Sequence, residues 1–253
     1  MRAASGPVPH GGEAPKLQYM QIVRMNPKKN PRSPASLVVA TAHTARGLRQ
    51  ARSLGRNEVG FVEVRLDAPD LPQARLGEAL QAIRPRLLLT ARHPAEGGAQ
   101  RLDAGQRRDL LEQYLLRAEA VDVELRSASS MASLLETARR RKITRVISFH
   151  DFRRTPRLPR LREIVRRSSA AGADIVKVAT QLSGPGDLAV LLLLQSTTKV
   201  PLATMGMGPL GKVSRLVLAA AGSRLNYGYL DKAQVSGQWP ALELVRRLEE
   251  IMP

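Results

Sequence analysis

Short apolar runs rich in β-branched residues alternate with amphipathic helical stretches along the chain from residue 36 onward. Such runs are typical of buried parallel strands, and the stretches between them, such as residues 103–119, carry apolar residues at helical spacing. Asp103 and Gln106 have the spacing of a capping box. The eight runs cover residues 37–42, 60–66, 87–92, 121–125, 144–149, 174–179, 200–205 and 224–229. This succession predicts an α/β chain folded as a (β/α)8 TIM barrel, because a doubly wound sheet usually has fewer strands and often a glycine-rich phosphate loop.

The first 35 residues differ from the rest of the chain. They are rich in glycine, proline, lysine and arginine, and they show little helical periodicity. This composition predicts a flexible basic N-terminal extension at residues 1–35, followed by a barrel catalytic domain at residues 36–253.

The chain is strongly basic, with 40 Lys and Arg against 22 Asp and Glu and a net charge of +18. A field of this sign attracts polyanions, so a polyanion-binding protein is one function class to weigh. The basic residues are scattered, however, and aromatic residues make up only 3% of the chain, which leaves few platforms for stacking bases. We therefore expect a solvated basic surface and no specific nucleic-acid partner.

The sequence lacks features that would indicate a metal ion or a membrane as a partner. The chain has no cysteine, and its histidines lie too far apart to resemble a metal-binding motif, so no metal site is expected. It has no run of about eighteen uncharged apolar residues, and its N-terminus lacks the apolar core of a signal peptide. We expect a cytoplasmic protein without a membrane partner.

Lys177 lies in the apolar run at residues 173–179, where a protonated amine is costly to bury. Desolvation favours the neutral amine, which attacks carbonyl groups to form a Schiff base. Taken alone, the residue favours a structural lysine, which extends to the strand end or pairs with a buried carboxylate, because structural ion pairs outnumber catalytic amines.

Polar side chains gather at the carboxyl ends of the predicted strands, where the functional groups of a TIM barrel lie. Glu63, Arg65 and Asp67 alternate along one strand and therefore share a face, predicted to line the barrel interior. They indicate either a network open to a polyol or a closed set of ion pairs. His150 is a candidate general acid and base, or a histidine that is only hydrogen-bonded. Further strand-end residues are Thr90, Arg92, Asp122 and Glu124, of which the last two are expected to partner a buried cation.

Six segments in order and spacing resemble type I 3-dehydroquinate dehydratase, a family of the shikimate pathway. They are 63–67 (EVRLD), 90–98 (TARHPAEGG), 122–125 (DVEL), 148–156 (SFHDFRRTP), 173–177 (ADIVK) and 213–216 (VSRL). The resemblance runs from about residue 37 to the C-terminus. It implies a lyase that needs no metal or cofactor and that dehydrates 3-dehydroquinate to 3-dehydroshikimate by syn elimination.

The resemblance also implies roles for individual residues. Lys177 would form the Schiff base, His150 would move the protons, and Glu96 would orient the histidine. Arg215 would clamp the substrate carboxylate through two nitrogens. The remaining implied substrate contacts are Glu63, Arg65 and Arg92 for the ring hydroxyls, and Gln238 and Gln234 in the loop after the last strand. A homodimer is common in the family and is implied here.

The chain departs from the family pattern at a few positions. Gln234 stands where the family usually has a serine that contacts the carboxylate, and Ser236 stands where it has a stiffening proline. Tyr227 occupies a position that is commonly phenylalanine, and residues 40–41 read Ala-Thr where a serine is common. These changes predict weaker substrate binding with the chemistry intact.

Three alternatives stay open at this point. Another Schiff-base barrel enzyme, such as an aldolase, would need Lys177 but not the set of Glu96, His150 and Arg215. A polyanion-binding protein on a degenerate barrel would need the basic residues to lie on one face. A degenerate relative with a different substrate would keep the barrel and part of the site.

Overall fold

A computed structural model describes residues 34–252 of the chain. Within this range, eight parallel strands form one sheet, with β1 between β2 and β8 and the other strands following in chain order. The strands are β1 (Val38–Ala42), β2 (Phe61–Arg65), β3 (Arg86–Thr90), β4 (Ala120–Glu124), β5 (Thr144–Asp151), β6 (Ile175–Gln181), β7 (Leu202–Met207) and β8 (Asn226–Tyr229). Each lies within a few residues of a predicted apolar run, and the predicted TIM barrel is confirmed.

The ring of strands closes between β7 and β8. No ladder of hydrogen bonds joins these two strands within the described residues, but the Arg224 amide donates to the Leu202 carbonyl at 2.9 Å beside their ends. The seam is therefore less extensively bonded than the other strand pairs.

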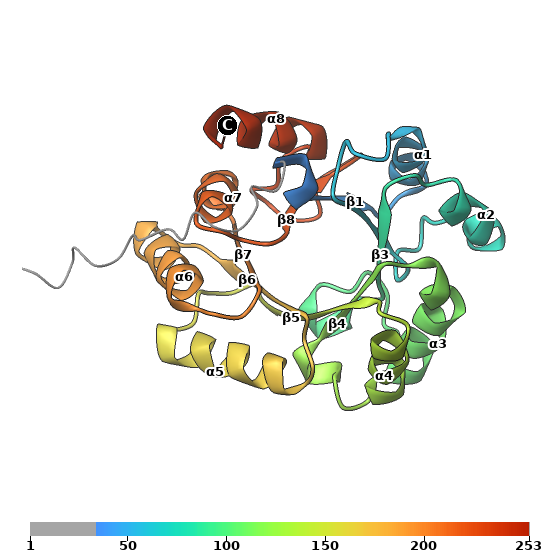
Figure 1. Ribbon diagram of the computed structural model, residues 1–253, viewed down its shortest axis with the longest axis horizontal. Helices are drawn as coiled ribbons and strands as arrows, with labels where there is room; N and C mark the ends of the chain where they lie inside the picture. The colour runs from blue at the N-terminus through green and yellow to red at the C-terminus, as the bar shows by residue number, and fades with distance from the viewer. Residues whose placement is uncertain (1–33, 253) are drawn as a thin grey trace, which may run out of the picture. The chain divides into compact units, whose positions relative to one another are not determined.

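Helices form an outer layer around the strands (Figure 1). They are α1 (Ala45–Ser53), α2 (Leu76–Gln81), α3 (Ala104–Tyr114), α4 (Ala132–Arg140), α5 (Leu158–Ala170), α6 (Pro185–Thr197), α7 (Gly211–Ala220) and α8 (Ala241–Ile251). No helix within residues 34–252 is long and apolar enough to cross a membrane.

The helix predicted at residues 103–119 begins as expected but ends earlier. Asp103 accepts a hydrogen bond from the Gln106 amide, and the Gln106 side chain accepts from the Asp103 amide, which completes the capping box. After Tyr114 the chain tightens into a 3₁₀ turn and becomes extended at Ala118, because it must enter β4 two residues later.

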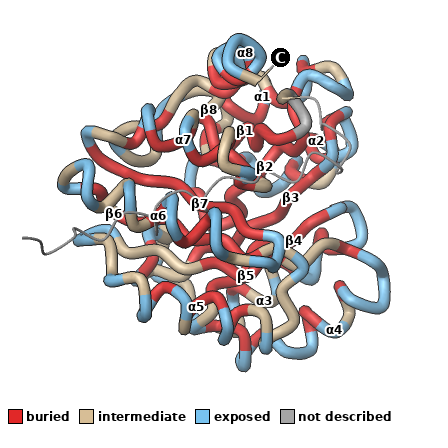
Figure 2. Tube along the Cα trace, turned by 60° about the vertical axis from the view of Figure 1, so that its left-hand side comes forward, coloured by how far each residue is buried: buried red, intermediate tan, exposed pale blue. Residues whose placement is uncertain are grey.

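Apolar residues fill the space between strands and helices and also the barrel interior toward the amino-terminal ends of the strands. Figure 2 shows the strands as mostly buried and the helices as alternating between buried and exposed residues. Interior positions on several strands are apolar first and polar two residues later. Val39 is followed by Thr41, Phe61 by Glu63, and Ala120 by Asp122. The interior-facing residues nearer the carboxyl ends of the strands therefore form a polar layer. The sequence predicted the functional groups at these ends.

The predicted extension at residues 1–35 falls almost entirely outside the described residues. Its flexibility and the domain boundary at residue 36 stay predictions.

Candidate active site

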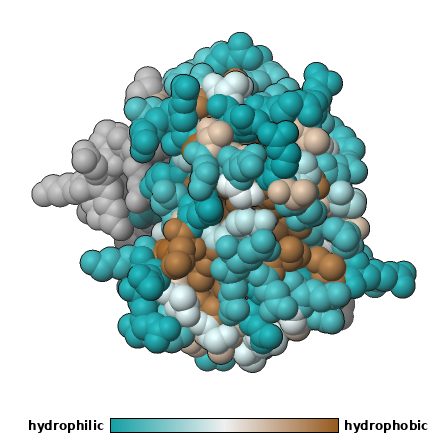
Figure 3. Space-filling model, turned by 90° about the vertical axis from the view of Figure 1, so that its right-hand side faces the viewer, coloured by the Kyte–Doolittle hydropathy of each residue, from teal (hydrophilic) through white to brown (hydrophobic). Residues whose placement is uncertain are grey.

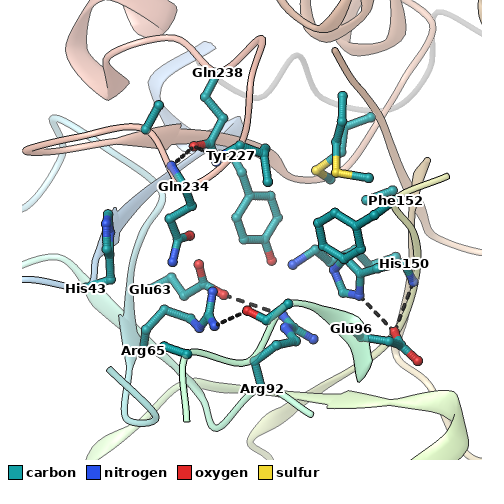
Figure 4. Close-up of a pocket in the computed structure, with 18 of the residues that line it drawn as sticks. His43, Glu63, Arg65, Arg92, Glu96, His150, Phe152, Tyr227, Gln234 and Gln238 are labelled. Carbon is teal, nitrogen blue, oxygen red and sulfur yellow. Dashed lines mark hydrogen bonds and ion pairs between the residues drawn. The ribbon is translucent and has the colours of Figure 1, made fainter. Parts of the chain in front are cut away.

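A pocket of about 370 Å³ opens at the carboxyl ends of the barrel strands (Figure 4). The structure brings together in its lining every site residue that the sequence indicated: Glu63, Arg65, Arg92, Glu96, His150, Lys177, Arg215, Gln234 and Gln238. They come from strands β2, β5 and β6, from the segment after β3, from the first turns of α7 and from the loop after β8. The barrel therefore assembles one polar site from side chains at the ends of its strands.

Lys177 lines this pocket and is only 4% exposed. Its Nζ donates a hydrogen bond to Asp122 Oδ2 at 2.9 Å and lies 3.8 Å from the centroid of the Tyr227 ring. Burial lowers the pKa of Lys177, and the nearby Arg92 charge lowers it further although Asp122 opposes the shift. The lysine is thus paired with a carboxylate, and its pKa is nevertheless shifted toward the neutral amine.

Arg92 connects the lysine to a wider buried network. Its guanidinium donates to both oxygens of Asp122 at 2.9 Å and to Glu124 Oε1 at 3.0 Å. It also donates to the Ser148 hydroxyl at 2.8 Å. Burial alone would raise the pKa of Asp122, but Arg92 and Lys177 hold it well below its usual range. Asp122 and Glu124 therefore partner buried cations, as the sequence indicated.

Glu63 and Arg65, which were expected to form one network, make separate contacts. Glu63 accepts hydrogen bonds from Thr41 at 2.9 Å and from Thr90 at 2.8 Å, and thus keeps acceptor capacity toward the pocket. Arg65 donates through two nitrogens to Asp67, at 2.9 and 2.8 Å, and to the Gly97 carbonyl at 3.0 Å. The structure thus combines a closed ion pair with an open carboxylate. Thr41 supplies a hydroxyl in the region where the family commonly has a serine.

His150 and Glu96 form a hydrogen-bonded pair beside Lys177. Glu96 Oε2 lies 3.0 Å from both His150 Nδ1 and the His150 amide nitrogen. Burial, reinforced by the Glu124 charge, raises the pKa of Glu96 to about 7. Burial, reinforced by Arg92 and Lys177, holds the pKa of His150 well below its usual value. The imidazole is therefore neutral at pH 7, and with Nδ1–H on Glu96 its Nε2 is available as a base.

Arg215 is buried with no carboxylate within ion-pair distance among residues 34–252. Its Nε donates to the Tyr227 carbonyl, and its Nη1 contacts the carbonyls of Gly206, Gly211 and Gly237 at 2.6–2.9 Å. Only Nη2 has no partner in the described part of the chain, so the expected two-nitrogen clamp is reduced to a single available nitrogen. Burial lowers the pKa of Arg215 to about 10.

The loop after β8 covers the pocket and is held by its own side chains. Gln238 Oε1 accepts from the Gln234 amide at 2.7 Å, and the Ser236 carbonyl accepts from the Gly208 amide at 3.0 Å. Gly237 has φ +80°, a left-handed conformation that favours glycine, and its carbonyl accepts from Arg215. The loop is therefore tied to the turn before α7, and Gln238 keeps its amide nitrogen for a ligand.

The sequence interpretation missed several residues of the lining. His43 lies directly after β1, where its position alone was a usable signal, but it was considered only as a metal ligand. Its Nδ1 is buried without a partner in the described residues. Phe152 stacks beside His150 with ring centroids 6.3 Å apart, and Lys232 lies in the covering loop.

Comparisons with known proteins agree with this geometry. Residues 36–252 match the type I 3-dehydroquinase family. A catabolic 3-dehydroquinate dehydratase of Acinetobacter baylyi is 31% identical over 86% of both chains. A 3-dehydroquinate dehydratase of Listeria monocytogenes is 33% identical over 84% of this chain and 90% of its own.

The fold comparison gives the same result. The crystal structure of 3-dehydroquinate dehydratase from Geobacillus kaustophilus superposes with a TM-score of 0.75 and 27% identity, over 85% of this chain and 90% of the other. With the family match spanning nearly the whole barrel, the chain belongs to the type I 3-dehydroquinase family.

Proposed function

We propose that the chain dehydrates 3-dehydroquinate to 3-dehydroshikimate through a Schiff base on Lys177. The reaction class, a carbon–oxygen lyase of the shikimate pathway, follows from family membership. One observation supports the covalent mechanism: a buried amine with a lowered pKa shares a pocket with a histidine held by a carboxylate. Lys177 alone would serve an aldolase equally well, but Glu96, His150 and Arg215 favour the dehydratase.

The covalent step begins when the neutral Lys177 amine attacks the C3 ketone of the substrate. The resulting carbinolamine loses water and leaves a protonated imine on Nζ. Asp122, 2.9 Å from Nζ, stabilises the positive charge of this imine. The imine withdraws electrons from the ring and makes the proton at C2 more acidic.

His150 carries the proton in the elimination. Its Nε2 removes the C2 proton, and the electron pair of that bond moves toward the imine to give an enamine. The enamine then expels the C1 hydroxyl, which leaves as water after taking the proton from His150. Glu96 accepts the Nδ1 hydrogen bond throughout and keeps Nε2 directed at the substrate. Water finally hydrolyses the imine and releases Lys177.

Substrate binding would use the buried charged side chains of the pocket lining. Arg215 Nη2 and the Gln238 amide nitrogen would bind the carboxylate, with Gln234 completing the site from the covering loop. Glu63 and Arg92, which lie 3.8 Å apart, would hold the ring hydroxyls, with Arg65 beside them.

Borohydride reduction in the presence of 3-dehydroquinate tests this proposal. We expect one reduced ligand on a peptide containing Lys177, and loss of both the adduct and the enone absorbance of the product in Lys177→Ala. Lys232 is the matched control because it is the other lysine of the pocket lining. An adduct on Lys232, or activity retained by Lys177→Ala, would contradict the mechanism.

We also propose that the protein is a homodimer formed through the outer face of α6 and α7. Leu192, Leu193, Val213 and Val217 are each at least 36% exposed on these neighbouring helices. Helix α6 contains Asp187 as its single charged residue. Figure 3 shows the face of the molecule on the side of α1 to α4, which is mostly hydrophilic with hydrophobic groups near its middle. Exposed apolar surface of this kind commonly marks an interface.

A cytoplasmic location and the absence of a specific nucleic-acid partner stay predictions of the sequence.

A further inference from the structure

We propose that the hydroxyl group of Tyr227 donates a hydrogen bond to the oxygen of the carbonyl group that Lys177 attacks. It would thereby speed the formation and breakdown of the covalent intermediate. The inference rests on the proposed function, because it assigns another group to the Schiff-base chemistry of the same pocket. Tyr227 lies in β8, at the position where the resemblance led us to expect phenylalanine, so the hydroxyl is the atom that needs an explanation.

The hydroxyl is buried without a hydrogen-bond partner in the described chain. Tyr227 is 3% exposed and lines the pocket, and its Oη has no donor or acceptor within reach among residues 34–252. Figure 4 shows the ring in the centre of the pocket, with the oxygen directed toward the space between Glu63, Arg92 and His150. A buried hydroxyl without a partner is unfavourable, so this oxygen is placed to meet a molecule that enters the pocket.

The charges around the hydroxyl fix its role as a donor. Burial raises the pKa of Tyr227 well above its usual value, and the carboxylates of Asp122 and Glu63 raise it further. The phenol therefore stays protonated across the whole working range of pH. Neither carboxylate accepts a hydrogen bond from Tyr227 Oη, which has no partner among residues 34–252. The phenolic hydrogen is thus left for an acceptor on the ligand.

The position of Lys177 indicates which ligand oxygen this is. The amine lies 3.8 Å from the centroid of the Tyr227 ring, so a carbon bonded to Nζ lies alongside the same ring. The oxygen on that carbon is then within reach of Oη at the edge of the ring. When Nζ adds to the carbonyl, this oxygen gains negative charge, and a fixed donor at that point stabilises the transition state.

The step balances without any further reagent. The C–N bond forms as the C=O double bond opens, and the amine proton passes to the oxygen to give the carbinolamine. The carbinolamine then loses water to give the imine, and hydrolysis of the imine reverses these events. Tyr227 keeps its proton through the formation and the hydrolysis of the imine, and it acts only through its hydrogen bond.

The backbone around Tyr227 is held on two sides, which fixes the hydroxyl before the substrate arrives. The Tyr227 carbonyl accepts from Arg215 Nε at 2.9 Å. At the next residue, Gly228, an added Cβ would lie 2.7 Å from the Ala241 Cα, so the strand is pressed against α8. A donor held in this way needs little reorganisation in the reaction.

Tyr227→Phe tests the proposal because it removes one atom and keeps the ring over Lys177. To measure the rate of imine formation, enzyme is mixed with 3-dehydroquinate and quenched with borohydride at intervals. The fraction of protein that carries the reduced adduct on Lys177 is then determined at each time. We expect this rate to fall by about tenfold to a hundredfold, on the scale of losing one transition-state donor. We also expect the kinetic isotope effect of a C2-deuterated substrate to shrink, because the covalent step then limits turnover. Tyr229→Phe, on the same strand but outside the pocket lining, should change neither quantity.

The outcomes separate this inference from the function on which it rests. An adduct that forms on Lys177 at the same rate in both proteins would overturn the role of Tyr227 and leave the Schiff-base mechanism standing. A higher KM with an unchanged trapping rate would also overturn it, since the hydroxyl would then contact a substrate hydroxyl instead. No adduct in the unaltered protein would refute the Schiff-base mechanism itself.

Discussion

Lys177 and Arg92 donate hydrogen bonds to the same oxygen atom, Oδ2 of Asp122, each at 2.9 Å. One carboxylate thus faces two cations, and the permanently charged guanidinium is the stronger competitor for it. The lysine can lose its proton without leaving Asp122 as an unpaired buried charge. This arrangement explains how an amine with a carboxylate partner still shifts toward the nucleophilic form.

Asp122→Asn should destabilise the protein, because it leaves Arg92 with less compensating charge in the barrel interior. We expect the free energy of unfolding in urea to fall by about 3 kcal/mol or more, the usual scale for breaking a buried pair. Glu136→Gln is the control, since Glu136 forms an exposed pair with Arg139 and its loss should change stability little. Equal stability of the Asp122 variant and the unaltered protein would contradict the network described here.

His150→Ala should reduce turnover by roughly a hundredfold to ten-thousandfold, the range of a general acid or base. Borohydride should still trap an adduct on Lys177, because that amine does not depend on His150 to reach the substrate. The enone absorbance measures turnover, and mass spectrometry measures the adduct. Normal turnover in this variant would show that His150 is not the general acid and base.

The activity should rise with pH through about 7, where Glu96 loses its proton. Only the carboxylate form accepts the Nδ1 hydrogen and leaves His150 Nε2 as a base. The effect of the same proton on stability has the opposite direction: the free energy of unfolding falls with rising pH. The folded pKa lies above the ordinary 4.5, so the folded state binds the extra proton and stability falls as the pH rises from about 4.5 to 7. Glu96→Gln should lose activity and flatten both profiles, as measured by initial rates and urea unfolding across pH 5 to about 8.

The paired replacement Gln234→Ser and Ser236→Pro should lower KM several-fold and leave kcat within a small factor. A proline reduces the backbone entropy that the loop loses on closing, and a serine orders fewer rotatable bonds than a glutamine. The Ser236 carbonyl, which the loop uses to hold Gly208, is retained by proline. If KM rises instead, Gln234 makes a specific contact with the substrate.

Placing glutamates at Leu193 and Val213 should convert the proposed dimer into a monomer. Two charges would be buried without partners at the α6 and α7 face, whereas the folded monomer keeps both positions in water. Sedimentation velocity measures the change, and Leu116→Glu is the control because Leu116 is 68% exposed in a different part of the barrel. If the unaltered protein sediments as a monomer, the proposed homodimer is wrong.

The barrel and the strand-borne part of the pocket lining could be predicted from the sequence for a physical reason, whereas Glu96 and the residues of the covering loop were implied only by the family resemblance. Strand alternation and the carboxyl-end rule fix which side chains meet, and Glu63, His150 and Lys177 obey both. What each side chain then contacts depends on neighbours from other strands. The pairing of Arg65 with Asp67 in place of Glu63 was not visible in the spacing.

Arg215 shows the limit most clearly. The family resemblance implied a cation near the substrate at this residue, and the structure places it in the pocket. Its backbone partners are carbonyls of segments that approach only in the folded barrel, so no local pattern could predict that Nη1 and Nε are already engaged.

Those contacts give Arg215 a second consequence for the molecule. Gly206 belongs to β7 and Tyr227 to β8, the two neighbouring strands without a ladder between them, and Arg215 donates to a carbonyl of each. A side chain thus supplies cross-links at the place where the backbone supplies few. Barrel closure and anion capture therefore depend on one guanidinium, so an anion bound at Nη2 should stiffen the seam, and any loosening of the seam should displace the anion-binding nitrogen.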